Sequence, residues 1–359
     1  MPVTLDDLRR FAVTRSLFPP TTLKRAMENM GFVQADPIRA PARAQDLILR
    51  HRVRDYRAGD LERRYAKLGI EEDFFINYGF ITRDLQKLMH PRPLGLGRTK
   101  KAKEVLGFVQ QRGEAHPREV DEHFAHGSVT NYWGGTSNAT THLLDAMHYH
   151  GMLRIARRDA GIRVYAPHQH TAAPGGAKAR RERIDALVDT AVHLYAPVPG
   201  ASLSYLVRRL RVAVPQWRGE LTAALQRARR RLSHARIDGV DWYWPEAESP
   251  IVPEPRGVVR LLTPFDPVVW DRSRLELLWN WVYRFEAYTP VAKRKLGYYA
   301  LPMLWRDRVI GWANLSVREH KLIADVGFVE SGPPEHAAFR DELEAELDRV
   351  RAFLGENVI

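Results

Sequence analysis

One outline occurs twice along the chain: three helical segments followed by a β-hairpin. In residues 102–167 the expected hairpin turns at Asp159-Ala160-Gly161. Residues 183–246 repeat the order, and their Asp238-Gly239 dipeptide is a strong signal for a tight hairpin turn. Three helices followed by a two-stranded hairpin are typical of a winged helix, which is a relative of the helix-turn-helix.

The first hundred residues are expected to hold a third, degenerate unit of this kind. Gly31 is expected to end a helix, because glycine accepts the left-handed backbone that often terminates helices. The expected elements are two helices within 4–30, a strand over 31–38, a long helix over 41–53, a helical stretch over 60–89 and a linker over 91–101.

From residue 257 the pattern changes to short stretches of β-forming residues separated by turns, which is typical of a small barrel or curled sheet. An amphipathic, acidic helix over 334–355 is expected to close the chain. The strands are expected at 258–262, 282–286, 298–302, 309–315 and 322–326.

Together these patterns predict an α+β fold, with tandem winged-helix (helix-turn-helix) domains followed by a C-terminal β-barrel-like domain. The predicted domains are a winged-helix-like domain over 1–100, winged helices over 101–170 and 180–248, and the barrel domain with its closing helix over 256–359.

Composition narrows the function classes. The net charge of +12 suits a polyanion such as nucleic acid, although Arg-rich codon usage alone can also produce such a surplus. The chain has no cysteine, which excludes disulfides, a thiolate nucleophile and iron–sulfur clusters. His168 and His170 could bind a metal, but no second cluster of ligands or nearby acids accompanies them, so we expect no metal and no cofactor.

No leader segment opens the chain and no apolar run approaches the roughly 18 residues of a membrane span, so we expect a cytoplasmic or nucleoid protein without a membrane partner. The sequence shows no dimerisation element, and we therefore expect a monomer.

Gln34 and Asp36 are the candidate catalytic residues. Pro37 disfavours a helical backbone at Asp36, and in an extended chain the two side chains project to the same side. A carboxylate can then take a proton from a water whose orientation the amide fixes through its donor and its acceptor. The alternative is a solvated turn, because Asp-Pro and Gln at alternate positions are common there.

Arginines follow this pair closely. Arg39, Arg43 and Arg50, with Arg52 and Arg54, line or flank the helix expected over 41–53, where they either face phosphates or form an ordinary solvated surface. The helix expected over 218–232 is also basic and occupies the position of a recognition helix.

Two motifs of the chain belong together. The first is Gln34-Ala35-Asp36, a Q-x-D tripeptide followed by Pro37-Ile38 and an arginine-bearing segment. The second and more specific motif runs from Pro264-Phe-Asp-Pro-Val-Val-Trp-Asp-Arg272 through Tyr283, Glu286, Tyr288, Pro290, Lys293-Arg294 and Gly297-Tyr-Tyr to Leu301-Pro302. Both resemble motifs of the winged-helix DNA glycosylases of the YcaQ/AlkZ type.

The resemblance implies three winged helices and a β-barrel arranged around double-stranded DNA. It implies that Gln34 and Asp36 catalyse excision of N7-alkylated purines, including interstrand crosslinks, in DNA repair. The chain departs from the family in two places: residues 74–84 are not rich in His and Ala, and Gly311-Trp312-Ala313-Asn314 stands where Gly-Arg-x-Asp is expected.

Three alternatives stay open. Lys293 and Arg294 either contact phosphate or form an ion pair with Glu286. Pro2 could form a Schiff base once Met1 is removed, but proline is common at this position, and we expect a monofunctional hydrolase. A non-catalytic winged-helix DNA-binding protein or transcription factor would explain the charge and the tandem units, but not the C-terminal motif.

Overall fold

The computed structural model describes residues 2–130, 136–168, 175–330 and 332–355. These residues form two compact units. The first unit comprises residues 1–61, 188–207 and 225–359, and the second comprises residues 62–187 and 208–224. No helix in the described ranges is both long enough and apolar enough to cross a membrane.

The first unit begins with the two expected helices, α1 (Leu5–Ser16) and α2 (Leu23–Met30). The Thr4 hydroxyl caps α1 and accepts a hydrogen bond from the Asp7 amide at 3.2 Å, which satisfies a donor that the first helical turn leaves free. Gly31 ends α2 with φ +68°, as its sequence position predicts. The expected strand is confirmed as β1 (Phe32–Gln34), which is shorter than predicted.

The prediction of a long helix over 41–53 is wrong. Only α3 (Ala44–Leu49) is helical, and the chain then turns. The buried Asp46 carboxylate accepts hydrogen bonds from the Tyr56 hydroxyl at 2.8 Å and from the Gly59 amide at 2.9 Å. These bonds fold the segment after α3 back on the helix instead of letting it continue.

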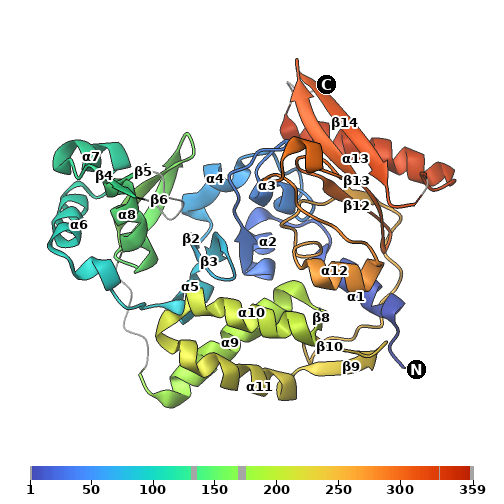
Figure 1. Cartoon of the computed structure of the whole chain (residues 1–359), viewed down its shortest axis with the longest axis horizontal. Coiled ribbons are helices and arrows are strands. Elements are labelled where there is room, and N and C mark those ends of the chain that lie inside the picture. Colours follow the sequence, from blue (N-terminus) through green and yellow to red (C-terminus); the bar gives the residue numbers. More distant parts are fainter. Residues whose placement is uncertain (1, 131–135, 169–174, 331, 356–359) are drawn as a thin grey trace. The chain divides into compact units, whose positions relative to one another are not determined.

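The C-terminal part of the first unit is a four-stranded antiparallel sheet in the order β11-β12-β13-β14. One sheet face carries the closing helix α13, whose Phe339 ring lies 5.4 Å from the Trp305 ring (Figure 1). Among the described residues β11 and β14 remain the edges, so of the two expected forms the structure has the curled sheet, a half-barrel, and not a closed barrel. The bounds are β11 Val259–Leu261, β12 Leu301–Trp305, β13 Arg308–Arg318, β14 Lys321–Phe328 and α13 Ala337–Leu354.

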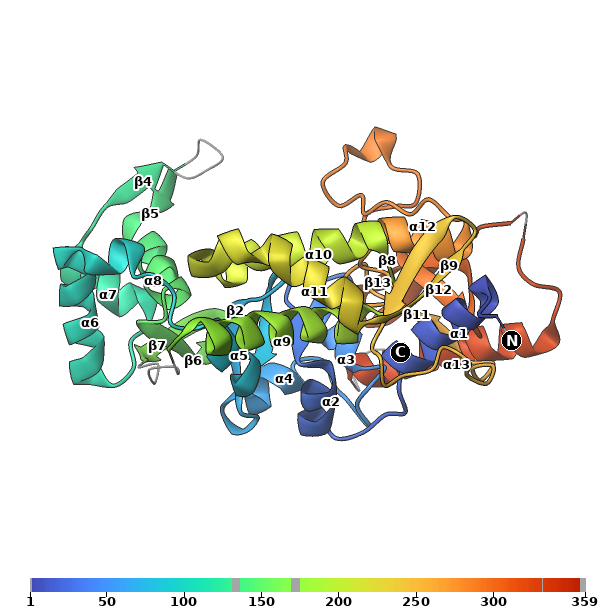
Figure 2. The same ribbon diagram turned by 90° about the horizontal axis from the view of Figure 1, so that it is seen from below.

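The prediction of a strand over 282–286 is also wrong, because this segment joins no sheet. Side chains anchor it instead: the Tyr283 hydroxyl donates to the Ala300 carbonyl at 2.7 Å, and the Arg272 guanidinium lies 4.5 Å from the Tyr283 ring centre. It belongs to a long connection between β11 and β12 that also contains α12 (Arg272–Trp279) and the short helix η4 (Val291–Lys293). The part around η4 projects from the unit as the orange arm in Figure 2.

The hairpin predicted around Asp238-Gly239 is confirmed as β9 (Ser233–Ile237) and β10 (Val240–Trp244), joined at the edge of β10 by β8 (Val198–Pro199). Trp242 and Trp244 are buried there and pack in the core, so they are not free to meet DNA. The helices expected before this hairpin are α9 Ala177–Tyr195, α10 Gly200–Ala213 and α11 Leu221–Arg231.

The second unit contains the other expected run of helices and a hairpin. The observed elements are α6 Lys100–Arg112, α7 Pro117–Phe124, α8 Ala139–Tyr149, β6 Leu153–Asp159 and β7 Ile162–Pro167. A further two-stranded pair, β4 (Ser128–Thr130) with β5 (Thr136–Asn138), precedes α8. The three helices and the closing hairpin follow the predicted order, but the β4–β5 pair was not predicted. The winged-helix arrangement and the four domain boundaries stay predictions.

The helical stretch expected over 60–89 is only partly helical. It contains α4 (Asp60–Arg64), a short helix η1 (Tyr65–Lys67) and α5 (Arg83–Met89), but its centre is the hairpin of β2 (Ile70–Phe74) and β3 (Tyr78–Thr82). The acidic residues of β2 are buried because basic residues from distant segments pair with them. Arg158 bonds to Glu72 and Arg92 to Asp73, each through a donor within 2.8 Å.

The prediction that residues 91–101 form a linker is wrong at its start, where Arg92 lies. The Arg92 side chain is buried, and it donates to the Ala213 carbonyl at 2.7 Å and to the Tyr149 carbonyl at 2.8 Å. The start of this segment is therefore fixed by hydrogen bonds, and a short helix η2 (Gly95–Arg98) follows.

Candidate active site

Gln34 and Asp36 lie where β1 ends, at alternate positions of an extended segment, and both are half-buried. Phe32 and Val33 are buried just before them, and this fixes the strand from which the pair emerges. One Asp36 oxygen, Oδ1, accepts a hydrogen bond from the Ile38 amide at 3.0 Å. Because the backbone itself holds this oxygen, the carboxylate has a defined orientation.

Burial raises the pKa of Asp36, and the hydrogen bond from the Ile38 amide opposes that rise only in part. A carboxylate with a raised pKa is a stronger base than a fully solvated one. The environment of Asp36 is therefore compatible with proton abstraction from water.

Tyr299 is an electrostatic neighbour of Asp36. Burial raises the pKa of Tyr299, the hydrogen bond with Thr263 opposes this, and the negative charge of Asp36 raises it further. The Tyr299 hydroxyl lies 3.0 Å from the Thr263 hydroxyl, and both side chains are buried. Thus the end of β1 and the connection after β11, which are more than two hundred residues apart, lie close enough for the charge of Asp36 to act on Tyr299.

An aromatic cluster adjoins this tyrosine. The Phe285 ring lies 5.3 Å from the Tyr299 ring and 5.4 Å from the Phe265 ring, in both cases edge to face. Tyr288 extends the cluster outward, with 81% of its surface exposed. These rings form an apolar cluster that reaches the neighbourhood of the Asp36 carboxylate through Tyr299, and aromatic side chains are suitable neighbours for a purine base.

Tyr299 is part of the C-terminal sequence motif, but the sequence alone assigns it no role. Thr263 lies just before this motif, and no sequence pattern points to it. For Tyr299, membership of this motif was the sequence signal that could have pointed to a role in the site. Thr263 had none, because its role depends on a contact with a residue of a distant segment.

Residues 264–272, the first half of the C-terminal motif, are held by buried arginines. Arg52 pairs with Asp266, and Arg274 donates to the Pro267 and Val268 carbonyls at 2.6 and 2.8 Å. Arg272 donates to the Pro264 carbonyl at 2.9 Å. These contacts satisfy backbone carbonyls of an irregular segment, so this part of the motif fixes the chain beside the site.

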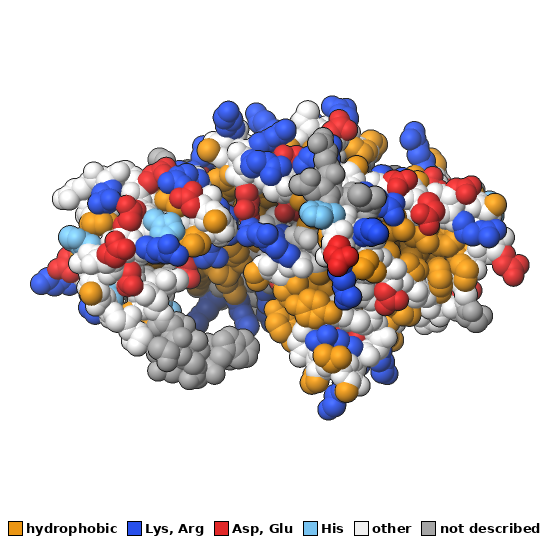
Figure 3. Space-filling model, turned by 90° about the horizontal axis from the view of Figure 1, so that it is seen from above, with side chains coloured by type: hydrophobic (Ala, Val, Ile, Leu, Met, Phe, Trp, Pro, Cys, Tyr) orange, Lys and Arg blue, Asp and Glu red, His pale blue; other side chains and the backbone are white. Residues whose placement is uncertain are grey.

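The arginines and the lysine predicted to contact DNA are not equivalent. Arg39 and Lys293 are exposed, and Arg43 and Arg294 are half-buried. The predicted DNA contact of Arg50 does not agree with the structure. Its side chain is 3% exposed and pairs with the Glu346 carboxylate, so it cannot reach a phosphate on the surface. Figure 3 shows one face of the molecule, on which basic and acidic side chains are interspersed.

The alternative of an ion pair between Glu286 and Lys293 or Arg294 does not describe the structure. The Glu286 carboxylate accepts hydrogen bonds from the Lys295 and Leu296 amides, both at 2.8 Å, and thereby closes the loop around η4. Arg294 donates to the Thr289 carbonyl at 2.8 Å. Both basic side chains are thus carried by a loop with an internal anchor.

The departure at 311–314 has a structural explanation in this chain. The Asn314 amide donates to the Leu296 carbonyl at 2.7 Å and accepts from the Tyr299 amide at 3.3 Å. Trp312 stacks on Trp281 with ring centres 6.2 Å apart. These two residues therefore hold the connection that carries Tyr299, where the family pattern has charged residues.

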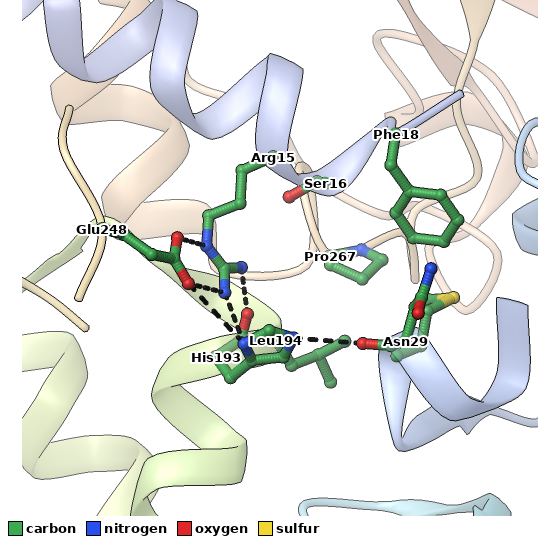
Figure 4. A pocket seen from close by; sticks show the side chains of 9 residues that line it. Arg15, Ser16, Phe18, Asn29, His193, Leu194, Glu248 and Pro267 are labelled. Carbon is green, nitrogen blue, oxygen red and sulfur yellow. Dashed lines mark hydrogen bonds and ion pairs between the residues drawn. The ribbon is translucent and has the colours of Figure 1, made fainter. Parts of the chain in front are cut away.

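A cavity of about 230 Å³ lies elsewhere in the first unit and includes neither Gln34 nor Asp36 (Figure 4). Its polar wall is a network in which Arg15 donates to Glu248 and to the His193 Nδ1 atom, while His193 Nε2 donates to the Asn29 carbonyl at 3.1 Å. The nitrogens of His193 are used within this network, which joins α1, α2 and α9.

The histidine pair of the sequence provides no metal centre that can be described. His170 lies outside the described residues, and among the described ones no group of three or more His, Asp or Glu side chains could hold a metal ion.

Comparison with known proteins identifies the family and the fold of the chain. The model of the family described as "DNA glycosylase AlkZ-like" matches residues 27–353. A solved structure, DNA glycosylase AlkZ of Streptomyces sahachiroi, is similar over 100% of both chains, with a TM-score of 0.63 and 15% sequence identity. The matched residues include the Gln34–Asp36 pair, Thr263 and Tyr299.

Proposed function

Because the chain belongs to the AlkZ-like DNA glycosylase family, we propose that it excises N7-alkylated purines, including bulky adducts and interstrand crosslinks, as a monofunctional enzyme of DNA repair. The family assignment removes the alternative of a non-catalytic DNA-binding protein. The observation that carries the residue assignment is the half-buried Asp36 carboxylate, oriented by the Ile38 amide and adjoining the aromatic cluster through Tyr299.

An N7-alkylated purine is cationic, so it leaves the sugar without first being protonated. The enzyme must then stabilise an oxocarbenium-like sugar and supply a water to C1′, as in glycoside hydrolysis. Asp36 takes the proton of that water, and its negative charge stabilises the sugar cation. Gln34 orients the water, because its amide both donates and accepts.

The aromatic cluster supports the choice of a bulky substrate. It is formed by Phe265, Phe285 and Tyr299, and Tyr288 extends it to the surface. A crosslinked base cannot leave the duplex completely, so an open apolar surface accommodates it better than a closed pocket would. Arg39 and Lys293, which are exposed, are the principal phosphate contacts that we propose, with Arg43 and Arg294 in support.

The test is base release from a duplex that carries a single N7-methylguanine. Asp36→Asn should lower the single-turnover rate by about 10²-fold or more while DNA binding is retained. Asp325→Asn is the matched control, because Asp325 is an exposed carboxylate of the same unit and should have no effect. Equal release by wild type and Asp36→Asn would refute the residue assignment.

The substrate range needs a separate measurement. The same proteins are assayed on a duplex with a nitrogen-mustard crosslink between N7 atoms of opposite strands. Unhooking by wild type and its loss in Asp36→Asn would support the crosslink proposal. Release of N7-methylguanine without unhooking would restrict the enzyme to monoadducts.

A further inference from the structure

A second site on the first unit is rich in arginine. It is a pocket of about 430 Å³ between the segment that follows α3 and the C-terminal end of α13. The arginines lining it are Arg50, Arg54, Arg57, Arg260 and Arg349, and His51 lies among them with a pKa that burial holds well below its ordinary value. Among the described residues that line it, Asp55 is the only carboxylate. We refer to it as the arginine pocket.

Several of these side chains have a structural task at the edge strand β11. Arg50 donates to the Leu261 carbonyl at 2.9 Å, and His51 Nε2 lies 3.0 Å from the same oxygen. Arg349 donates to the Val259 carbonyl at 3.0 Å. These side chains satisfy backbone carbonyls that an edge strand leaves free.

Arg260 and Arg54 have no such task. In β11 the Val259 and Leu261 side chains are buried, and Arg260 between them projects to the other side of the strand. Within the described part of the chain, no acceptor bonds to the Arg260 or the Arg54 guanidinium. Arg54 is exposed, whereas Arg260 is half-buried.

The surroundings of Arg260 are unfavourable for a lone cation. Burial lowers the pKa of Arg260, and the charges of Arg52, Arg349 and Arg50 lower it further, while Glu346 opposes them. Desolvating a guanidinium without a partner is costly, and a planar guanidinium forms its strongest bonds with carboxylate or phosphate oxygens. An anion in the pocket would supply acceptors that the described protein groups do not.

We propose that the arginine pocket binds a phosphate group, with Arg260 and Arg54 as its principal ligands and Arg57 beside them. The pocket is distinct from the Gln34–Asp36 site and shares no residue with it. Two sources share this chemistry: a phosphodiester of the DNA backbone and the phosphate of a free nucleotide. The pocket assignment does not depend on which damaged base is excised.

The first measurement is the thermal unfolding midpoint of the full chain in sodium phosphate and in sodium chloride at equal ionic strength. A ligand that binds only the folded state raises the midpoint with concentration. Wild type should be stabilised more by phosphate than by chloride, and Arg260→Gln should lose the difference. Arg54→Gln is a second variant at an exposed position, where folding is not at risk.

Arg340→Gln is the matched control. It removes the same charge from an exposed position on α13, roughly 14 Å along the helix from Arg349, and outside the pocket. Its response to phosphate should equal that of wild type.

The second measurement is binding of a fluorescent undamaged duplex at several salt concentrations. If the ligand is backbone phosphate, Arg260→Gln should bind roughly tenfold more weakly, and the slope of log K against log salt should fall by about 0.9. Unchanged duplex binding with a lost phosphate response assigns the pocket to a free nucleotide.

The proposal is overturned if phosphate and chloride stabilise wild type equally and all three variants bind the duplex alike. Neither measurement uses a damaged base. A failure of the pocket proposal is therefore distinguishable from a failure of the excision proposal.

Discussion

Arg52 and Asp266 form a bidentate ion pair in which both side chains are 0% exposed. Arg52 Nη1 lies 2.7 Å from Asp266 Oδ2, and Nη2 lies 3.0 Å from Oδ1. Arg52 also donates to the Ser16 and Ile48 carbonyls, both at 2.8 Å. One side chain thus joins α1, α3 and the start of the C-terminal motif.

Removing one partner of this pair should be strongly destabilising. Asp266→Ala leaves the Arg52 guanidinium buried without its counter-charge, and we expect a loss of about 3–5 kcal/mol in the free energy of unfolding. Urea unfolding followed by circular dichroism measures it. The control is Asp84→Ala, which removes an ion pair with Lys87 whose side chains are mostly exposed, and it should cost about 1 kcal/mol or less. Equal losses in the two variants would mean that the buried pair does not hold the unit together.

The sequence predicts elements well where the signal is local. Gly31 ends α2 because its left-handed backbone is a property of that one residue, and Asp238-Gly239 forms the expected hairpin turn for the same kind of reason. The helix caps and the amphipathic α13 are equally local. Element order could therefore be predicted over much of the chain.

The sequence fails where distant charges pair. Glu72 resembles an exposed residue of a helix, but it is buried in β2 because Arg158, eighty-six residues later, bonds to it. Arg50 and Arg52 resemble a solvated basic face, but both are buried against acids of the C-terminal part. Periodicity cannot distinguish these cases, because it carries no information on tertiary partners.

Only the Gln34–Asp36 part of the candidate site could be predicted from the sequence. The extended Gln34 and Asp36 segment follows from Pro37 and from alternation, which are local features. Thr263 and the aromatic cluster belong to the connection between β11 and β12, for which the sequence wrongly predicts a strand at 282–286. With a strand there, the approach of this connection to Asp36 could not be predicted. Their place in the site depends on the connection's hydrogen bonds, such as the one from Tyr283 to Ala300.

Gly297 should tolerate no side chain. Its φ is +111°, and a Cβ atom there would lie 2.4 Å from the Asn314 amide nitrogen, which anchors the loop. Gly297→Ala should therefore displace Tyr299 and lower base release by tenfold or more, on the order of a 1.4 kcal/mol loss. The control is Gly219→Ala, because a Cβ atom at Gly219 meets nothing within 4 Å. Full activity of Gly297→Ala would show that the loop can shift without affecting the site.

The contact between Thr263 and Tyr299 can be measured by a double-mutant cycle. Tyr299→Phe and Thr263→Val each remove one hydroxyl and leave the other buried without its partner, so each should cost about 1–2 kcal/mol of unfolding free energy. The double variant should cost less than the sum by about 1 kcal/mol, because no orphaned hydroxyl remains. Additive losses would show that the two hydroxyls do not interact in solution.

The pH dependence of base release reports on Asp36. Asp36 acts as a base only when ionised, and burial raises its pKa above the ordinary value of 3.8. The single-turnover rate, corrected for spontaneous release, should therefore fall as the pH drops through an apparent pKa above 3.8. Asp325→Asn should leave this acidic limb in place.

The same shift has a consequence for stability with the opposite sign. A carboxyl group whose pKa is higher in the folded than in the unfolded state favours folding only at low pH, and this contribution is lost as the pH rises through the folded-state pKa. Above that pKa the ionised Asp36 is thus destabilising, and Asp36→Asn should there raise the unfolding midpoint slightly while it lowers base release by about 10²-fold or more. A fall in the midpoint at pH 7, or an acidic limb at or below 3.8, would show that Asp36 is held mainly by interactions that favour its charge. In that case Asp36 would be better suited to stabilise the sugar cation than to abstract a proton.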